Sequence, residues 1–297
     1  MRGVRNPPAS GQAGQARKYT VVMILSFSPA SANGSAASLA LALPSVFALF
    51  AYAAAAGLDS RRATVLRWAL LAGWAAHALA IVTDIADIGS VVAVARFGFA
   101  TALSVTVWLV LAVYVVESRF VPLPGARRTL ALLGMVVVAL AWWFPGEPRA
   151  QLASRWVPLH WVMGIASYGL FGAAVLHAAM LNRAERQMRQ AAPTGGGMPL
   201  LRLERLTFSF VKAGFVVLTA ALLLGAWFAD PWRWDHKTVF SMLGWVVFAS
   251  LLAGRRAFGW RGPAATRWVY TGAALLLLAY VGSRFVLEVL LQRPSAF

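Results

Sequence analysis

The sequence lacks cysteine altogether and has few acidic residues, 10 against 27 lysines and arginines in 297 residues. Without a thiol, the chain can be neither a thiol–disulfide relay nor a thiolate metal site. It also has no glycine-rich phosphate loop, no convincing internal repeat and no segment large enough for a separate soluble domain. Because only 12% of the residues are charged, a soluble globular protein is excluded as well.

Hydrophobic residues make up 60% of the chain and occur in long runs separated by arginines. The runs lack the alternating pattern of outer-membrane barrel strands, so we expect an all-α polytopic integral membrane protein of a bacterial inner (cytoplasmic) membrane. A formal net charge of +17 would suggest nucleic-acid binding in a soluble protein. Here it indicates membrane topology and attraction to anionic membrane lipid.

A bilayer core of about 30 Å is crossed by about 20 apolar residues in a helix, which predicts about eight transmembrane helices for this chain. These are residues 36–57, 64–83, 96–116, 129–144, 158–181, 207–228, 238–254 and 267–290. They form one transmembrane domain, 36–291, made of a five-helix part, 36–181, a cytoplasmic linker, 182–206, and a three-helix part, 207–291. Residues 1–35 are expected to be an extension that is disordered or precedes the native start, for which Met23 is a candidate. Residues 292–297 are a tail.

Arginines gather in every second loop. The arginine-rich loops contain Arg61, Arg62 and Arg67; Arg119, Arg127 and Arg128; Arg183, Arg186, Arg189, Arg202 and Arg205; and Arg255, Arg256, Arg261 and Arg267. The other loops contain Arg96, Arg149, Arg155, Arg233 and Lys237, diluted by Asp84, Asp87, Glu147, Asp230 and Asp235. The positive-inside rule places the first set in the cytoplasm, so both termini are expected outside.

One of the outer loops, Trp227–Lys237, concentrates aromatic and ionisable side chains. It contains Trp227, Trp232, Trp234, Asp230, Asp235, His236 and Lys237. Tryptophan is enriched at every membrane–water interface, so the indoles alone are typical of an interfacial belt. A flat surface of aromatic side chains beside charged groups is also suited to binding a large planar ligand with charged edges.

Ionisable groups inside a membrane are costly, so each of the four histidines is a functional candidate. His160 lies at the outer start of a helix, between Trp156 and Trp161, where it is either a belt residue or a ligand for a metal. His77 lies within the second helix, and His236 lies in the tryptophan loop. His177 follows His160 on the same helix, about 25 Å away, and is expected to be a packing or snorkelling residue.

Arg284 lies in the last predicted helix, four residues before Glu288. One interpretation is an ion pair along the helix, which would contribute about 0.3 kcal/mol to stability and has the cation and the anion in the less favourable order. Its other interpretation is a cation for a carboxylate ligand, and Lys237 beside Asp235 has the same two interpretations. Arginine suits a carboxylate better because its donors are forked.

The segment Pro231-Trp-Arg-Trp-Asp-His-Lys-Thr-Val-Phe-Ser-Met-Leu-Gly-Trp245 resembles the tryptophan-rich "WWD" segment of the CcsA/CcmC cytochrome c assembly family. The similarity covers most of the chain from Ala36 to Leu291 and is closest to the YpjD-type branch. Other matching segments are Ala76-His-Ala-Leu-Ala-Ile81, Leu159-His-Trp-Val-Met-Gly-Ile-Ala-Ser-Tyr168, Met198-Pro-Leu-Leu, Gly259-Trp-Arg-Gly262 and Leu278-Ala-Tyr-Val-Gly-Ser-Arg284.

This resemblance implies a protein that binds haem b non-covalently at the outer membrane face, for cytochrome c maturation or a related haem delivery step. His160 matches the family's outer haem histidine, and His77 matches a buried histidine where a transmembrane haem site is proposed. The tryptophan loop would line the site through Trp227, Trp232, Trp234 and Asp235, with Lys237 or Arg284 at the haem propionates. A partner or the apocytochrome would supply the thiols, and no enzymatic reaction by this chain is expected.

Two departures from the family pattern concern the iron ligands. Asp235 is followed by His-Lys-Thr, where the family motif continues with Pro-Lys-Glu, and residues 282–291 lack the family's second outer histidine. We hypothesise that His236 supplies the missing axial ligand opposite His160.

Two other functions are open at this point. The outer groups Asp84, Asp87, Asp230, Asp235 and His236 could gather a divalent cation for a transport or resistance permease. A conduction path needs carboxylates within the helices, where the sequence has almost none apart from Glu288. The third function is a membrane scaffold that keeps the fold without haem.

Overall fold

The computed structural model describes residues 35–57, 62–88, 95–120, 126–148, 156–190, 199–228, 234–286 and 289. In chain order its helices are α2 (Ser35–Gly57), α3 (Ala63–Ile85), α4 (Phe99–Glu117), α5 (Ala126–Trp143), α6 (Val157–Arg189), α7 (Leu200–Phe228), α8 (His236–Phe258), α9 (Gly262–Leu277), the π-helix η1 (Leu278–Gly282) and α10 (Ser283–Phe285). Within these ranges, 8 helical spans are long and apolar enough to cross a membrane. The predicted all-α polytopic fold is confirmed.

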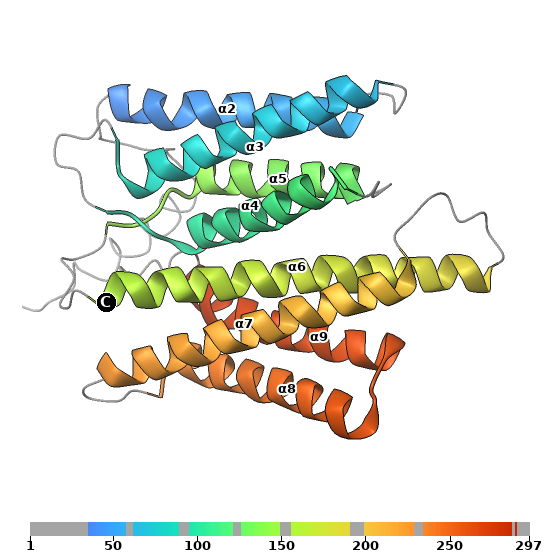
Figure 1. Cartoon of the computed structure of the whole chain (residues 1–297). Coiled ribbons are helices and arrows are strands. Elements are labelled where there is room, and N and C mark those ends of the chain that lie inside the picture. Colours follow the sequence, from blue (N-terminus) through green and yellow to red (C-terminus); the bar gives the residue numbers. More distant parts are fainter. Residues whose placement is uncertain are drawn as a thin grey trace, which may run out of the picture.

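The spanning helices lie side by side and successive helices run in opposite directions, so each helix ends at the end of the bundle where the next one begins (Figure 1). We call one end the arginine-rich end; there α2, α4, α6 and α8 end and α3, α5, α7 and α9 begin. The other is the tryptophan-rich end, where α6 and α8 begin and α7 ends. Which end faces the cytoplasm stays a prediction from the charge pattern.

Two apolar clusters divide the bundle. Helices α2 to α5 supply most of the first, and its centre is Tyr52, whose ring lies against Gly73 and Gly134. A methyl group at either glycine would come within 2.8 Å or 2.9 Å of that ring, so the small residues allow three helices to approach closely. The second cluster joins α6, α7, α8 and α9 around Phe171 and Phe248, whose rings stack at 3.8 Å.

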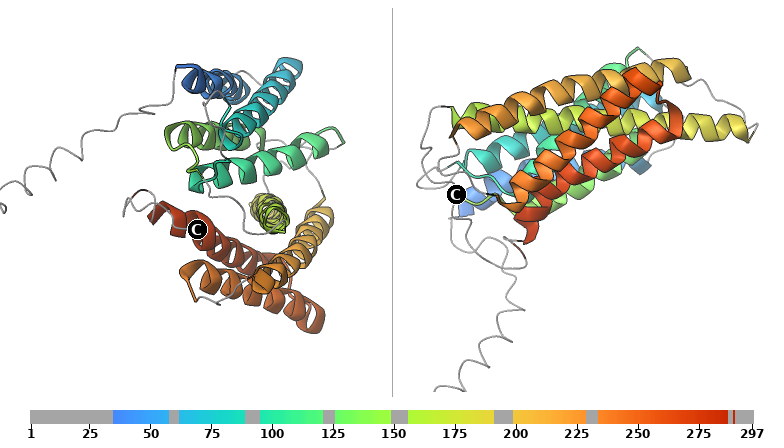
Figure 2. Two further views of the ribbon diagram at one scale, coloured as in Figure 1. Left: turned by 90° about the vertical axis from the view of Figure 1, so that its left-hand side faces the viewer. Right: turned by 90° about the horizontal axis from the view of Figure 1, so that it is seen from below.

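Helix α6 lies between the two groups of helices, which is plain when the bundle is viewed from the tryptophan-rich end (left panel of Figure 2). Its 33 residues make a helix of about 50 Å, longer than a bilayer core of about 30 Å. The helix continues past the predicted boundary at residue 181 to Arg189, because good helix formers follow and no glycine or proline interrupts them.

The connection between α6 and α7 is therefore shorter than the predicted linker, 182–206. The last part of that range, from Leu200 onward, belongs to α7. The middle of that range, residues 191–198, lies outside the described residues, as do residues 1–34 and the tail 292–297.

Candidate functional site

His160 sits on the first turn of α6 at the tryptophan-rich end, where it is half-buried. Its Nδ1 lies 2.9 Å from the carbonyl oxygen of Ala221 on α7. A carbonyl oxygen only accepts hydrogen bonds, so Nδ1 carries a proton, and in the neutral imidazole Nε2 then keeps its lone pair. Nε2 has no hydrogen bond to any other described residue. This is the arrangement of a metal-ligating histidine, which usually donates its second ring N–H to a carbonyl or carboxylate.

Gly225 makes this placement of the imidazole feasible. A methyl group at Gly225 would lie 2.8 Å from Cε1 of His160, which is closer than carbon atoms approach without displacement. The glycine lies one turn beyond Ala221 on α7, so the same helix face both accepts the hydrogen bond and leaves room for the ring.

Three aromatic rings form a connected group that begins at Trp161, the residue after His160. Trp161 stacks on Phe97 with ring centroids 6.2 Å apart, and Phe97 in turn contacts Tyr280 of η1 at 5.9 Å. A π-helix within a longer helix is frequently found at functional sites. Tyr168, from the segment Leu159–Tyr168, ties α6 to this region by donating its hydroxyl proton to the carbonyl oxygen of Leu276, at 2.6 Å.

Two cations lie at the edge of the same group. Lys237 Nζ is 5.9 Å from the centre of the Tyr280 ring, and Arg284 Cζ is 5.8 Å from it. Lys237 is also close enough to His160 to act on it electrostatically. The structure therefore brings together three of the predicted site residues, His160, Lys237 and Arg284, from α6, α8 and α10. Two cations beside a flat aromatic surface suit an anionic planar ligand.

The other described residues of the tryptophan loop are exposed at the surface. Trp227 and Trp234 expose 86% and 70% of their surfaces, and Trp232, like Asp230, lies outside the described residues. Asp235 caps α8 by accepting the Thr238 N–H at 2.7 Å, a structural role that the loop pattern alone did not reveal. His236 follows as the first, exposed residue of α8, and no contact joins it to His160 in the described part of the chain.

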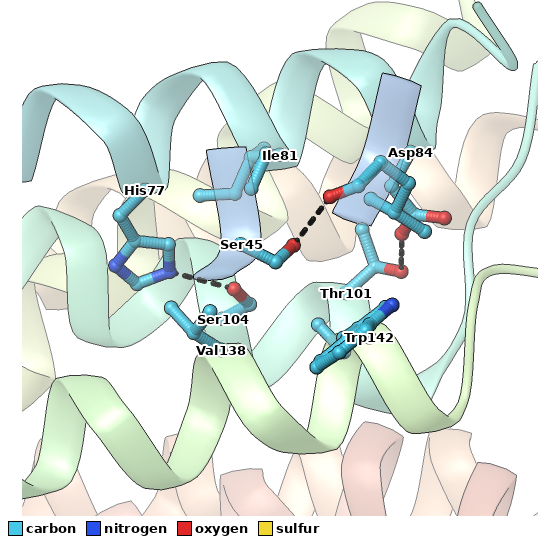
Figure 3. A pocket seen from close by; sticks show the side chains of 11 residues that line it. Ser45, His77, Ile81, Asp84, Thr101, Ser104, Val138 and Trp142 are labelled. Carbon is cyan, nitrogen blue, oxygen red and sulfur yellow. Dashed lines mark hydrogen bonds between the residues drawn. The ribbon is translucent and has the colours of Figure 1, made fainter. Parts of the chain in front are cut away.

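His77 has a different environment, inside the first cluster. Its Nε2 lies 2.7 Å from the Ser104 hydroxyl and its Nδ1 lies 3.1 Å from the Tyr52 hydroxyl. The neighbouring cavity, between His77 and Asp84, has a volume of about 10 Å³, which is room for about one water molecule (Figure 3). Haem iron could reach His77 only after a hydrogen bond broke and the helices separated.

Two carboxylates at the tryptophan-rich end, one on the last turn of α3 and one just after it, hold the helix ends together. Asp84 accepts hydrogen bonds from the Thr101 hydroxyl at 2.6 Å and from the Gly146 N–H at 3.0 Å (Figure 3 shows the first). Asp87 pairs with Arg96 at 3.0 Å, and Arg96 also donates to the Gly146 carbonyl oxygen at 2.6 Å. No group of three or more histidine or carboxylate side chains positioned for a metal ion occurs among the described residues. Asp84 and Asp87 thus have structural partners.

Sequence reasoning did not select Phe97, Tyr280 or Gly225 as parts of this site. Tyr280 and Arg284 are four residues apart and so share a helix face, which was an available signal. The sequence contained no such signal for Phe97 and Gly225, because their contacts form between segments far apart in the chain.

A family model described as "Cytochrome C assembly protein" matches residues 64–291 of this chain. "Inner membrane protein YpjD" of Escherichia coli (strain K12) is 30% identical over 162 residues, which cover 52% of this chain and 62% of the relative. "Cytochrome c biogenesis protein CcsA" of Prochlorococcus marinus (strain MIT 9515) is 26% identical over 162 residues, 46% of this chain and 52% of the relative. The matched regions thus span less than two thirds of these relatives. No solved structure matches the chain.

Proposed function

Since the chain belongs to the cytochrome c assembly protein family, we propose that it binds haem b at the tryptophan-rich end, as cargo for cytochrome c maturation or a related haem delivery step. The observation that carries this proposal is the contact of 2.9 Å between Nδ1 of His160 and the Ala221 carbonyl oxygen. The Ala221 carbonyl oxygen fixes the ring proton on Nδ1 and leaves Nε2 available for iron.

The donor set fits the chemistry of haem. An axial imidazole binds the iron, aromatic side chains cover the hydrophobic macrocycle, and cations bind the two propionates. In this chain those roles fall to His160, to the rings of Trp161, Phe97 and Tyr280, and to Lys237 and Arg284. The indoles of Trp227, Trp232 and Trp234 would extend the aromatic surface, and His236 stays our candidate for the second axial ligand.

The role we propose is to hold and hand on haem, not to react with it. The sequence has no cysteine, so the thiols that attach haem to an apocytochrome must come from a partner or from the apocytochrome itself. The multi-pass inner-membrane location fits this role, with the tryptophan-rich end on the outer face by the positive-inside rule.

The test is an absorption spectrum of the purified protein supplied with haem, in the oxidised and dithionite-reduced states, beside a His160→Gly variant. The wild type is expected to give a Soret band with split reduced α and β peaks, and the variant to lose intensity. Adding free imidazole to the variant should restore the band, because the small ligand replaces the missing side chain. A wild-type spectrum in His160→Gly would rule out His160 as ligand, and a colourless wild type would favour the scaffold function.

His236→Ala tests the second ligand separately. If His236 binds the iron, its removal shifts the spectrum from six-coordinate toward five-coordinate haem while the haem stays bound through His160. An unchanged spectrum would remove His236 from the site and leave the rest of the proposal standing.

A further inference from the structure

The last described spanning helix changes its winding near the tryptophan-rich end. The α-helix α9 continues directly into the π-helix η1 (Leu278–Gly282), and the N–H of Ser283 reaches the carbonyl oxygen of Leu278, five residues back instead of four. A π-turn inside an α-helix acts as one additional residue, so it turns the chain after it by about 100° around the helix axis. The presence of η1 therefore decides in which direction the side chain of Arg284, two residues after it, points.

A tyrosine hydroxyl of α6 binds the chain just before this change of winding. Tyr168 donates its proton to the Leu276 carbonyl oxygen at 2.6 Å. In an uninterrupted α-helix that carbonyl oxygen would accept the N–H of Tyr280, four residues on, and Tyr280 lies inside η1. A side chain that enters the hydrogen-bond ladder of a helix is a known cause of a local change in its path. The hydroxyl thus engages the helix where α-helical bonding gives way to π-helical bonding.

Packing holds both partners of this hydrogen bond in place. Leu276 is almost completely buried, and its side chain fits against Gly244 of α8, where a methyl group would come within 2.9 Å of it. The ring of Tyr168 packs against the same apolar cluster, the one around Phe171 and Phe248. The hydroxyl and the carbonyl oxygen are therefore kept opposite each other by the assembled helices.

The side chains that η1 orients belong to the candidate site. The Tyr280 ring lies 5.9 Å from the Phe97 ring, with Lys237 Nζ and Arg284 Cζ 5.9 Å and 5.8 Å from its own centre. Of the two cations, Lys237 comes from the start of α8 and Arg284 follows η1. A rotation of about 100° after α9 would move Arg284 away from this group and leave Lys237 where it is.

We propose that Tyr168 is a positioning residue, whose hydroxyl keeps η1 π-helical so that Arg284 lies beside Lys237 and faces the carboxylates of the bound ligand. Tyr168 follows His160 by eight residues on α6, about 12 Å along the axis, so it acts through η1 and not by contact with the iron ligand. The identity of the ligand rests on the proposed function; the hydrogen bond and the form of helix that it maintains do not.

The other end of the same pair of helices offers a matched control. There Tyr270 of α9 accepts a hydrogen bond from Asn182 of α6 at 3.1 Å. Tyr270→Phe and Tyr168→Phe each remove one hydroxyl from the α6–α9 contact and keep the aromatic ring, so both keep the packing. Only Tyr168→Phe removes a hydrogen bond next to η1.

Spin labels can measure the orientation of the chain after η1 without haem, since the chain has no cysteine to remove. We would introduce Val239→Cys on α8 and Val286→Cys after α10, both exposed positions, in the full chain in lipid nanodiscs. A rotation of about 100° moves the second label by several ångströms. Tyr168→Phe is expected to shift the distance between the labels, and Tyr270→Phe to keep the value of the parent. An unchanged distance in Tyr168→Phe would overturn the proposal.

Haem titration tests the consequence for the ligand. In Tyr168→Phe the affinity for haem should fall about tenfold, because one charge-assisted contact to a propionate is lost. The affinity for haem dimethyl ester should stay, and so should the position of the Soret band, because His160 is unchanged. Equal losses for haem and the ester would contradict the positioning role, since they would show a general disturbance of the site. A parent protein that binds no haem would refute the proposed function, and the label distances would still decide whether Tyr168 maintains η1.

Discussion

His160 and His177 lie on the same helix and each directs Nδ1 at a backbone carbonyl oxygen, but their Nε2 atoms differ in environment. At the tryptophan-rich end, the carbonyl oxygen belongs to Ala221 of a neighbouring helix, and Nε2 of His160 has no partner among the described residues. Near the arginine-rich end, the carbonyl oxygen is one turn back on α6, and Nε2 of His177 meets Glu117 at 2.8 Å.

The comparison teaches that the second contact of an imidazole decides its chemistry. A ring with one fixed proton and one available lone pair can bind a metal. The same ring with Nε2 2.8 Å from a carboxylate oxygen has that nitrogen occupied, and it joins α6 to α4 instead. His77, bonded on both sides to hydroxyl groups, is a third case in which the ring joins helices. Four changes would break or sharpen this comparison.

The largest effect on stability is expected from His177→Ala. The change leaves the Glu117 carboxyl buried without its partner, and breaking a buried pair in this way costs about 3–5 kcal/mol. Thermal unfolding in detergent would measure it. His236→Ala, at an exposed histidine, is the control and should change stability by less than about 0.5 kcal/mol. Equal small effects from both changes would mean that the His177–Glu117 contact contributes little.

Gly225→Ala should disturb His160 without changing its chemistry. The added methyl group would lie 2.8 Å from Cε1 of the ring, so the imidazole must move, and we expect haem affinity to fall about tenfold, or about 1.4 kcal/mol. Gly164→Ala is the matched control on α6, because a methyl group there meets nothing within 4 Å. Haem titration would compare them. Equal affinities in the two variants would mean that the position of the His160 ring does not limit binding.

Lys237→Gln should weaken haem binding by about 1 kcal/mol if the ammonium contacts a propionate, because such partly exposed ion pairs contribute modestly. Lys237→Arg, which keeps the charge, should bind nearly as wild type. The readout is the affinity for haem beside that for its dimethyl ester, which lacks the propionate charges. The difference between wild type and Lys237→Gln should vanish with the ester; if it persists, Lys237 acts in another way.

The smallest effect is expected at Asp235, and it separates a helix cap from a ligand contact. Asp235→Ala removes the acceptor for the Thr238 N–H and should cost about 0.5–1 kcal/mol of stability, whereas Asp235→Asn retains an acceptor and should cost less. Thermal unfolding and haem titration of both variants would check this. Loss of haem binding in Asp235→Asn without loss of stability would show that the carboxylate charge serves the ligand.

The helices and three members of the candidate site, His160, Lys237 and Arg284, were named from the sequence. Long apolar runs separated by arginines define the spans, and His160 was identifiable because it opens a helix between two tryptophans. The extension of α6 to Arg189 was missed because the polarity of residues 182–189 marks the end of the membrane span, and a helix can continue into water.

The partners of the histidines were not predictable in the same way. Glu117 is 60 residues from His177, and Ala221 is 61 residues from His160. Such contacts depend on which helix faces pack together, and a single sequence with similar apolar runs does not define that packing. His177 was expected to be a packing or snorkelling residue, so its contact with Glu117 was not anticipated.

The central claim, that the two histidines of α6 have different functions, is tested most directly by titrating haem into His160→Ala and His177→Gln side by side with the wild type. Our account predicts that His160→Ala loses the Soret band of the wild type and that folded His177→Gln keeps it. A band that survives in His160→Ala, or that disappears only in folded His177→Gln, would contradict the account.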